Sequence, residues 1–341
     1  IIFSGGGTRF GMYCGMYDCL EEFGQAPDLI IATCGGSLAA TIINSFDNAS
    51  SRKSYLKSEE LYRYVHSPQL TKQKKLSRLG LFCLNKLFIK QDAPIIEDVF
   101  NRYLVDLPQD LSSLFPQLTC KPAASRISTV IIGSRLLFTP DEVGQKRGER
   151  KLYRKVIFTD KYTSEQIDKN FIKLLSSNYS YSAVDSHIEI ISDVPLLTAT
   201  RISVSDMFYV APVLYKGIYY AGGAIDLLPI ELAKSLAEHL IIERKHAYSH
   251  TEEALVRSVL GYSGNTRLSE IEQIAHCPSI DTTNAGSMLK EHSVSKSIDW
   301  KRLQIKLITP KSYTQFVIDM EIQWQYGYNK TRELMQQGGT L

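Results

Sequence analysis

The fold is decided by residues 1–46, which read IIFSGGGTRFGMYCGMYDCLEEFGQAPDLIIATCGGSLAATIINSF. Two short apolar runs, residues 1–3 and 29–32, have the length and composition of buried strands. A turn of small residues follows each run, and apolar side chains at helical spacing come next, in residues 10–23 and 38–46. Two consecutive strand–turn–helix units predict parallel strands joined by right-handed crossovers, and therefore an α/β fold.

Length and composition are those of a large globular protein. The chain has 341 residues, of which 44% are hydrophobic, so it can bury one large core or two ordinary ones. No clear linker, repeat or low-complexity segment divides the sequence. We therefore predict a single domain over residues 1–341, with its core motifs in 1–46 and 195–235 and with 50–125 and 245–300 as cap or insert regions.

Charge and cysteine usage narrow the class of protein. A formal net charge of +3 is too small to indicate a nucleic-acid partner. The six cysteines and seven histidines show no spacing typical of a zinc site, so we expect no metal and no other cofactor. No run in the sequence approaches the roughly 18 apolar residues of a transmembrane helix.

The first turn, Gly5-Gly6-Gly7-Thr8-Arg9, indicates an anion site. Successive glycines between a strand and a helix let backbone N–H groups point into one cavity, where they stabilise an oxyanion. Arg9 is suited to steady this loop or to bind a substrate phosphate. A dinucleotide-binding fingerprint does not fit, because it requires glycine at Phe10 and an acidic residue after the second strand.

The second turn, Gly35-Gly36-Ser37-Leu38-Ala39, is typical of a nucleophile elbow. A serine between small residues, on a tight turn from strand to helix, is held outward beside the unpaired N–H groups of the helix N-terminus. Gly35 and Gly36 leave steric room, and Ala39 stands where G-x-S-x-G has its last glycine. The alternative is that Ser37 simply caps the helix, since serine is a favoured N-cap residue.

A third turn, Ala221-Gly222-Gly223-Ala224-Ile225-Asp226, follows a predicted strand at residues 218–220. Together the three turns resemble, in the same order, the motifs of the patatin-like phospholipases and lysophospholipases: a glycine-rich oxyanion loop, a G-x-S-x-G elbow and a D-G-[GA] turn. Phe10 departs from the last glycine of the family's loop. The resemblance covers residues 1–46 and 195–235.

The resemblance implies a three-layer α/β/α patatin-like fold with a mostly parallel central sheet and an added helical cap. It also implies a Ser–Asp dyad in which Ser37 forms an acyl-enzyme and the backbone of residues 5–9 holds the oxyanion. The elbow would consist of Gly35, Gly36, Leu38 and Ala39 around that serine. The dyad aspartate would precede Gly222 and Gly223, at the position of Ala221.

Alanine at position 221 leaves the implied dyad without its base. A methyl group accepts no proton, so we expect this chain to be inactive or nearly so. Because Gly222, Gly223, Asp226 and Pro229 keep the family's pattern, we interpret Ala221 as an introduced aspartate-to-alanine change, with a natural inactive relative as the alternative. Asp226 lies five residues along the turn and is better interpreted as a turn or cap residue.

A Ser-His-Asp triad is a further alternative, since hydrolases of the elbow type place a histidine late in the chain. His276 and His292 are the late candidates. Neither follows an obvious strand in a small-residue turn, and we interpret both as surface or interhelical residues.

Two basic segments bear on lipid contact. Residues 72–90 mix apolar side chains with six cations and no acid, which is typical either of a segment at an anionic membrane surface or of a helix with a solvated basic face. Residues 146–155 form a second basic run between predicted strands at 129–138 and 152–159. It is most simply a hairpin loop, and it is also suited to contact phosphate-bearing lipids or an activating anionic ligand.

The remaining pattern predicts helices at residues 230–244 and 317–336 and a strand at 303–308. The function that the sequence predicts is hydrolysis of (lyso)phospholipid acyl esters at a phospholipid membrane surface. A lipid-binding or regulatory protein without turnover and an acyltransferase are the alternatives. We expect a cytoplasmic or peripheral-membrane protein. Because the chain starts inside a strand and lacks an initiator Met, residues are expected upstream, and export as an effector stays open.

Overall fold

The computed structural model describes residues 1–88, 92–118, 127–167 and 179–337. Its centre is a seven-stranded sheet in which β1, β2, β5, β6 and β7 lie side by side in that order and β9 pairs with both β5 and β8. The strands are β1 (Ile2–Phe3), β2 (Leu29–Ala32), β5 (Ser128–Leu136), β6 (Tyr153–Phe158), β7 (Val184–Ile191), β8 (Val213–Tyr215) and β9 (Ile218–Ala221).

The pairing of the strands makes the sheet mixed. β1 pairs with β2 and β2 with β5 in parallel, which confirms the parallel strands predicted for the first two strand–turn–helix units. β5 and β6 are antiparallel, so the basic run at residues 146–155 begins in their connection, as predicted, and ends within β6. β9 is antiparallel to β5 and brings Ala221 opposite Ser134.

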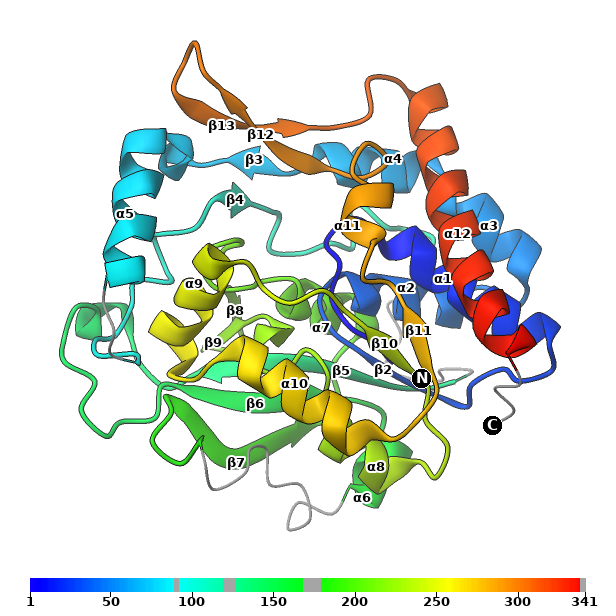
Figure 1. Cartoon of the computed structure of the whole chain (residues 1–341), viewed down its shortest axis with the longest axis horizontal. Coiled ribbons are helices and arrows are strands. Elements are labelled where there is room, and N and C mark those ends of the chain that lie inside the picture. The colour runs from blue at the N-terminus through cyan, green and yellow to red at the C-terminus, as the bar shows by residue number, and fades with distance from the viewer. Residues whose placement is uncertain (89–91, 119–126, 168–178, 338–341) are drawn as a thin grey trace.

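Helices cover both faces of the sheet (Figure 1). Side chains alternate along β2, so Ile30 and Ala32 belong to one core cluster and Leu29 and Ile31 to another. The first cluster includes side chains of α1 (Phe10–Glu22), α2 (Gly35–Ser45) and α12 (Tyr313–Gln336), and the second those of α8 (Ile230–Leu236), α9 (His250–Leu260) and α10 (Gly264–Ala275). The predicted α/β/α layering is confirmed.

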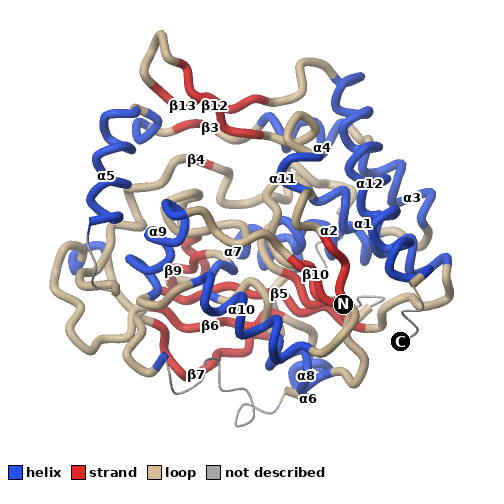
Figure 2. Tube along the Cα trace, in the orientation of Figure 1, coloured by secondary structure: helices blue, strands red, loops and turns tan. Residues whose placement is uncertain are grey.

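A further layer lies above the sheet edge, as Figure 2 shows. We call it the cap. It contains β3 (Gln69–Leu70), the short 3₁₀ helix at Lys72–Lys74, α5 (Leu76–Phe88), β4 (Val105–Asp106), α11 (Ala285–Met288), β12 (Ser295–Asp299) and β13 (Gln304–Ile308). The other elements are α3 (Ala49–Leu56), α4 (Glu59–His66), α6 (Lys161–Gln166), α7 (Leu196–Ser203), β10 (Ile242–Arg244), β11 (Ser279–Asp281) and 3₁₀ turns at Pro140–Glu142 and Gly223–Ile225. The cap therefore contains short strands as well as helices.

One predicted element is wrong in part. The helix expected over residues 230–244 ends at Leu236, and residues 242–244 form β10, which pairs in parallel with β11. The Ile2 N–H also donates to the Ile241 carbonyl at 3.0 Å, so this segment lies beside β1. Its isoleucines are buried there. Burial against the sheet therefore outweighs the helical pattern of the local sequence.

Two further points concern predicted membrane contact. Among the described residues, no helix combines the length and hydrophobicity needed to cross a bilayer. Ile89 and Lys90, the end of the predicted basic segment, lie outside the described residues, as does Cys120.

Helices α1 and α12 cross at an unusually short distance. A Cβ atom on Gly15 would overlap the Trp324 carbonyl, and one on Gly327 would overlap the Met12 carbonyl. Both glycines therefore allow backbone-to-backbone contact that no larger residue permits. This contact attaches the last described helix to the first.

We expect Gly327→Ala to lower the free energy of unfolding by about 1–3 kcal/mol, because the added methyl group forces the two backbones apart. Chemical denaturation of the wild-type and variant proteins measures the difference. The matched control is Gly80→Ala in α5, where the added Cβ meets no atom within 4 Å. It should be neutral or stabilising by up to about 1 kcal/mol, and an equal loss in both variants would contradict the steric explanation.

Candidate active site

The strained turn between β2 and α2 is occupied by Cys34. Its φ of 46° and ψ of −123° place a non-glycine residue in a sparsely populated backbone region. The Cys34 N–H donates to the Ser203 hydroxyl at 2.9 Å, which fixes the turn. A sharp strand-to-helix turn of this kind is how hydrolases expose a nucleophile. The elbow of this chain therefore presents a thiol.

Ser37 lies elsewhere, and the prediction that it is held outward at the elbow is wrong. Helix α2 begins at Gly35, three residues earlier than expected, so Ser37 is inside its first turn. The Ser37 side chain is fully buried and its hydroxyl donates to the Cys34 carbonyl at 2.5 Å. Behind it, the Thr200 hydroxyl donates to the Ser37 carbonyl at 3.2 Å. Ser37 thus supports the elbow from within the core.

The glycine loop lies directly against the elbow, as predicted for an oxyanion site. A Cβ atom on Gly5 would come within 2.8 Å of the Cys34 Cβ, and one on Gly35 would lie only 2.2 Å from the Gly7 carbonyl oxygen. The backbone N–H groups of Gly7 and Gly35 lie close enough to the Cys34 sulfur to lower the pKa of its thiol. Two N–H donors therefore point to the atom at which an acyl group would be attached.

Buried side chains hold the loop in this position. The Tyr13 hydroxyl donates to the Ser4 carbonyl and lies 2.9 Å from the Glu243 carboxylate, which also accepts from the Ser4 hydroxyl. On the outer side, the Arg9 guanidinium donates to the Gly6 carbonyl at 3.1 Å. Arg9 therefore steadies the loop, which is one of its two predicted roles.

Thr8 connects the loop to the cap and to α12. Its hydroxyl accepts the Val294 N–H at 2.8 Å, and its carbonyl accepts the Gln323 amide at 3.2 Å. A shift of either element would therefore move the glycine loop.

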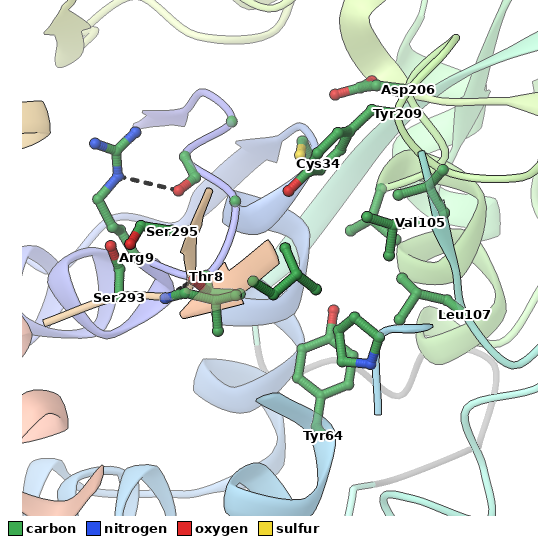
Figure 3. A pocket seen from close by; sticks show the side chains of 18 of the residues that line it. Thr8, Arg9, Cys34, Tyr64, Val105, Leu107, Asp206, Tyr209, Ser293 and Ser295 are labelled. Carbon is green, nitrogen blue, oxygen red and sulfur yellow. Dashed lines mark hydrogen bonds between the residues drawn. The ribbon is translucent and has the colours of Figure 1, made fainter. Parts of the chain in front are cut away.

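A cavity of about 390 Å³ opens above the loop and the elbow (Figure 3). Cap residues supply much of its apolar wall, whereas polar groups gather at the loop and at Lys290. The lining residues that matter here are Gly5, Gly6, Gly7, Thr8, Arg9, Cys34, Val105, Leu107, Val204, Asp206, Tyr209, Leu227, Lys290 and Leu307. The cavity can hold an apolar chain with a polar group at the loop.

The third predicted turn also reaches the elbow. A Cβ atom on Gly223 would lie 3.0 Å from the Thr33 Cβ, and the Gly222 N–H donates to the Ser205 carbonyl at 2.7 Å. Ala221 is fully buried in the core. Asp226 forms a buried ion pair with Lys155 at 2.6 Å, so its interpretation as a structural residue fits.

An acid that the sequence did not single out lies beside this turn. Asp206 is in the loop after α7, and its Oδ1 accepts the Ala224 N–H at 3.1 Å. A Cβ atom on Gly222 would overlap the same oxygen. Burial raises the pKa of Asp206 to about 6, against hydrogen bonds from the Ala224 N–H and the Cys34 side chain. Burial and the Asp206 charge raise the pKa of the Cys34 thiol to about 12.

No sequence spacing connects Asp206 to Cys34, because 172 positions separate them and only the fold brings them together. The sequence did contain a signal for Cys34, which lies two residues after a predicted strand and directly before two glycines. The partial match to G-x-S-x-G centres on Ser37, three residues further along the chain.

A second cavity of about 760 Å³ adjoins the first, and Asp206 and Tyr209 line both. Side chains of α5, α9 and β13 form its largely apolar wall, including Leu81, Leu255 and Ile305. Together the two cavities give an acyl-sized apolar space on either side of Asp206.

The late histidines and the basic run at residues 146–155, which the sequence offered as alternative catalytic or anion-binding groups, form contacts of other kinds. The His292 ring contacts Asp319 at 2.9 Å, and His276 ends α10, consistent with interhelical and surface roles. In the basic run, Arg150 pairs with Glu142 and Arg154 with Asp185. Across the described ranges, no group of three or more His, Cys, Asp or Glu residues is arranged to hold a metal ion.

Comparison with known proteins identifies the family. Residues 1–234, more than half of the chain, match the family model of the patatin-like phospholipases. None of the curated proteins matches. The structure is similar to the crystal structure of VipD from Legionella pneumophila, with 11% sequence identity and a TM-score of 0.38, over 98% of this chain and 66% of that chain. The chain belongs to the patatin-like phospholipase family.

Proposed function

We propose that this chain cleaves acyl esters of phospholipids or lysophospholipids at a membrane surface. Family membership supports lipid acyl hydrolysis in general. The substrate class is supported by one observation above all: two backbone N–H groups meet at the elbow, on the floor of a cavity with apolar walls. An ester carbonyl at the loop would place its acyl chain along Val105 and Leu107 and its head group toward Lys290 and Arg9.

The implied Ser37–aspartate dyad is not part of this proposal. Ser37 is buried behind the elbow, and Ala221 supplies no proton acceptor. The elbow also carries Cys34 where the family's pattern has serine. Two changed positions at one site favour natural divergence over a single introduced substitution at position 221.

A second candidate function is lipid binding without turnover, and Ala221 is the observation that favours it. In that case the cavity would retain an acyl chain while ester cleavage is absent. Measuring both lipid binding and fatty-acid release separates the two functions.

We expect Leu107→Trp to reduce release of long-chain fatty acid from mixed phosphatidylcholine–phosphatidylserine vesicles by at least roughly tenfold, because the indole fills the acyl cavity and removes about 1.4 kcal/mol or more of apolar burial. Fatty-acid release and retention of a fluorescent acyl lipid are the measurements. Leu214→Trp is the control, since Leu214 is 54% exposed on β8. Unchanged lipid retention in Leu107→Trp would contradict the proposed binding cavity.

The membrane part of the proposal rests on the β12–β13 hairpin and α5, which we call the hairpin–α5 edge. Its large apolar side chains are exposed: Trp300 by 72%, Leu81 by 64%, Leu303 by 59% and Leu84 by 52%. Figure 1 shows the hairpin projecting from the cap above α5. Apolar groups at such exposure usually mark a contact surface.

Cations surround these apolar groups. The exposed ones are Lys72, Lys75, Arg78, Lys296, Lys301, Arg302 and Lys306. The Leu76 N–H donates to the Leu303 carbonyl at 2.9 Å, which holds the basic start of α5 against the hairpin tip. Aromatic and apolar side chains beside lysine and arginine fit an anionic bilayer surface. The same edge forms part of the wall of both cavities, through Leu81, Ile305 and Leu307.

We expect the double variant Trp300→Glu/Leu303→Glu to weaken binding to phosphatidylserine-containing vesicles by roughly tenfold or more, since burying each side chain contributes about 1.5–3 kcal/mol. Vesicle sedimentation measures the partitioning, and wild-type binding should also fall as salt is raised. Tyr162→Glu is the matched control, because Tyr162 is 70% exposed on α6, far from the cap in Figure 1. Equal loss in the control would contradict this docking surface.

A further inference from the structure

We propose that Cys34 and Asp206 form a thiol–carboxylate pair that takes the place of the serine–aspartate dyad, with Cys34 as the nucleophile and Asp206 as its proton acceptor. The inference deepens the proposed function and rests on it for the choice of substrate. Cys34 stands at the elbow position where the family's pattern has serine, whereas Asp206 comes from a different loop than the aspartate turn at residues 221–226.

The position of Cys34 is that of a nucleophile. It occupies the strained residue of the elbow, its side chain lines the cavity, and the N–H groups of Gly7 and Gly35 point to its sulfur. Those donors would stabilise the oxyanion that forms when sulfur attacks a carbonyl. A cysteine retained only for packing has no need of backbone strain or of a cavity in front of it.

The position of Asp206 is that of a displaced base. Its carboxylate lines the same cavity as the Cys34 side chain and lies against Gly222, directly after the vacant aspartate position. In Figure 3, Cys34, Tyr209 and Asp206 lie on the same wall of the cavity. The acid therefore enters the site from the loop after α7 instead of from the end of β9.

The loop that carries Asp206 is firmly held. The buried Arg201 guanidinium donates to the Pro108 carbonyl at 2.6 Å and to the Ser205 hydroxyl. In the cap, the Val105 N–H donates to the Tyr209 carbonyl at 2.8 Å. These contacts attach both ends of the loop to the cap and to α7, and so fix the carboxylate relative to Cys34.

Because the pKa of the Cys34 thiol is raised to about 12 and that of Asp206 to about 6, the thiol gives up its proton to Asp206 only as the sulfur attacks the ester. The titratable and charged groups that act on Asp206 or respond to its charge are Cys34, Lys245, Tyr209 and Tyr248. Lys245 lowers the pKa of both Asp206 and Cys34, and burial raises the pKa of Tyr209 to about 12, so that phenol stays neutral. With its pKa raised to about 6, Asp206 is ionised at neutral pH and is a stronger base than an ordinary carboxylate.

The reaction balances with water as the second substrate. Asp206 takes the thiol proton while Cys34 Sγ bonds to the ester carbonyl carbon, and the carbonyl electrons move to the oxygen held by the glycine loop. Collapse breaks the carbon–oxygen ester bond, and the leaving alkoxide takes the proton from Asp206. Water then attacks the thioester, giving one proton to Asp206 that returns to the departing sulfur, so an ester and water become an acid and an alcohol.

The first test uses p-nitrophenyl decanoate and intact-protein mass spectrometry with peptide mapping. The wild-type chain should gain a decanoyl group on Cys34 that neutral hydroxylamine removes, as it does thioesters. Cys34→Ala should gain none, and any group on Cys34→Ser should resist neutral hydroxylamine because it is an oxygen ester. Cys277→Ala is the control variant, because it removes a different thiol that is half-buried and near the N-terminal amine. It should react as the wild type does.

The role of Asp206 is tested by the rate of acylation as a function of pH. The wild-type rate should rise with pH through about 6 as Asp206 loses its proton. Asp206→Asn should lower the rate by roughly 100- to 10,000-fold and remove that rise, and Asp206→Glu should restore part of both. Lys245→Gln should move the rise to higher pH, because Lys245 lowers the pKa of Asp206.

Thermal unfolding separates this role from a structural one. The folded-state pKa of Asp206 is above the unfolded value of 3.8, so the ionised carboxylate lowers stability as pH rises from about 4 through about 6. Asp206→Asn should therefore unfold at a higher temperature than the wild type above pH 6, while it reacts more slowly. A variant that loses both stability and reactivity would show that Asp206 is structural and would overturn its role as base.

The remaining outcomes distinguish the pair from the proposed function. Fatty-acid release from vesicles by Cys34→Ala at the wild-type rate would overturn the pair and leave the proposed function standing. An unaltered rate and pH profile in Asp206→Asn would overturn the role of Asp206, and absence of any adduct on wild-type Cys34 would overturn the role of the thiol. An adduct on Cys34 in a chain that neither binds nor cleaves vesicle lipids would keep the pair and overturn the proposed function.

Discussion

The site depends on the contact between two backbone turns, the glycine loop after β1 and the elbow after β2. Gly5 and Gly35 leave no space for a side chain between them, and only this approach brings the Gly7 N–H to the Cys34 sulfur. Because parallel strands end at the same edge of a sheet, the β1–β2 pairing makes the two turns meet. Tyr13, Glu243 and the Thr8 contacts then hold the loop in place.

The features that lower the stability of this arrangement are concentrated at a few groups in and around the site. Cys34 holds a strained backbone, and Asp206 is kept in surroundings that oppose its ionised form. Arg201 is fully buried, and burial lowers its pKa to about 10 while its guanidinium binds main-chain carbonyls. Groups of this kind lower stability unless the surrounding fold fixes them, and the α/β/α core and the cap both do so here.

The cap lies next to the elbow and also forms an outer surface of the protein. Its strands supply the apolar wall above the elbow, and its hairpin and α5 present apolar and basic side chains outward. A lipid bound at the hairpin–α5 edge would enter cavities lined by the same elements. In the proposed function, recognition of the surface and binding of the acyl chain would both depend on this one layer, which a hydrogen bond to Thr8 connects to the glycine loop.

Local sequence alone determined the elements and the order of the three turns, because apolar periodicity and glycine runs act over a few residues. Strand β2, helix α1 and the layering followed from it, and so did the glycine loop. Local sequence did not decide where α2 begins, which moved the elbow from Ser37 to Cys34. Nor could it show that residues 242–244 pair with β11, or that Asp206 lies against the turn that follows Ala221. Those outcomes depend on contacts between residues far apart in the chain, which only the packed tertiary structure creates.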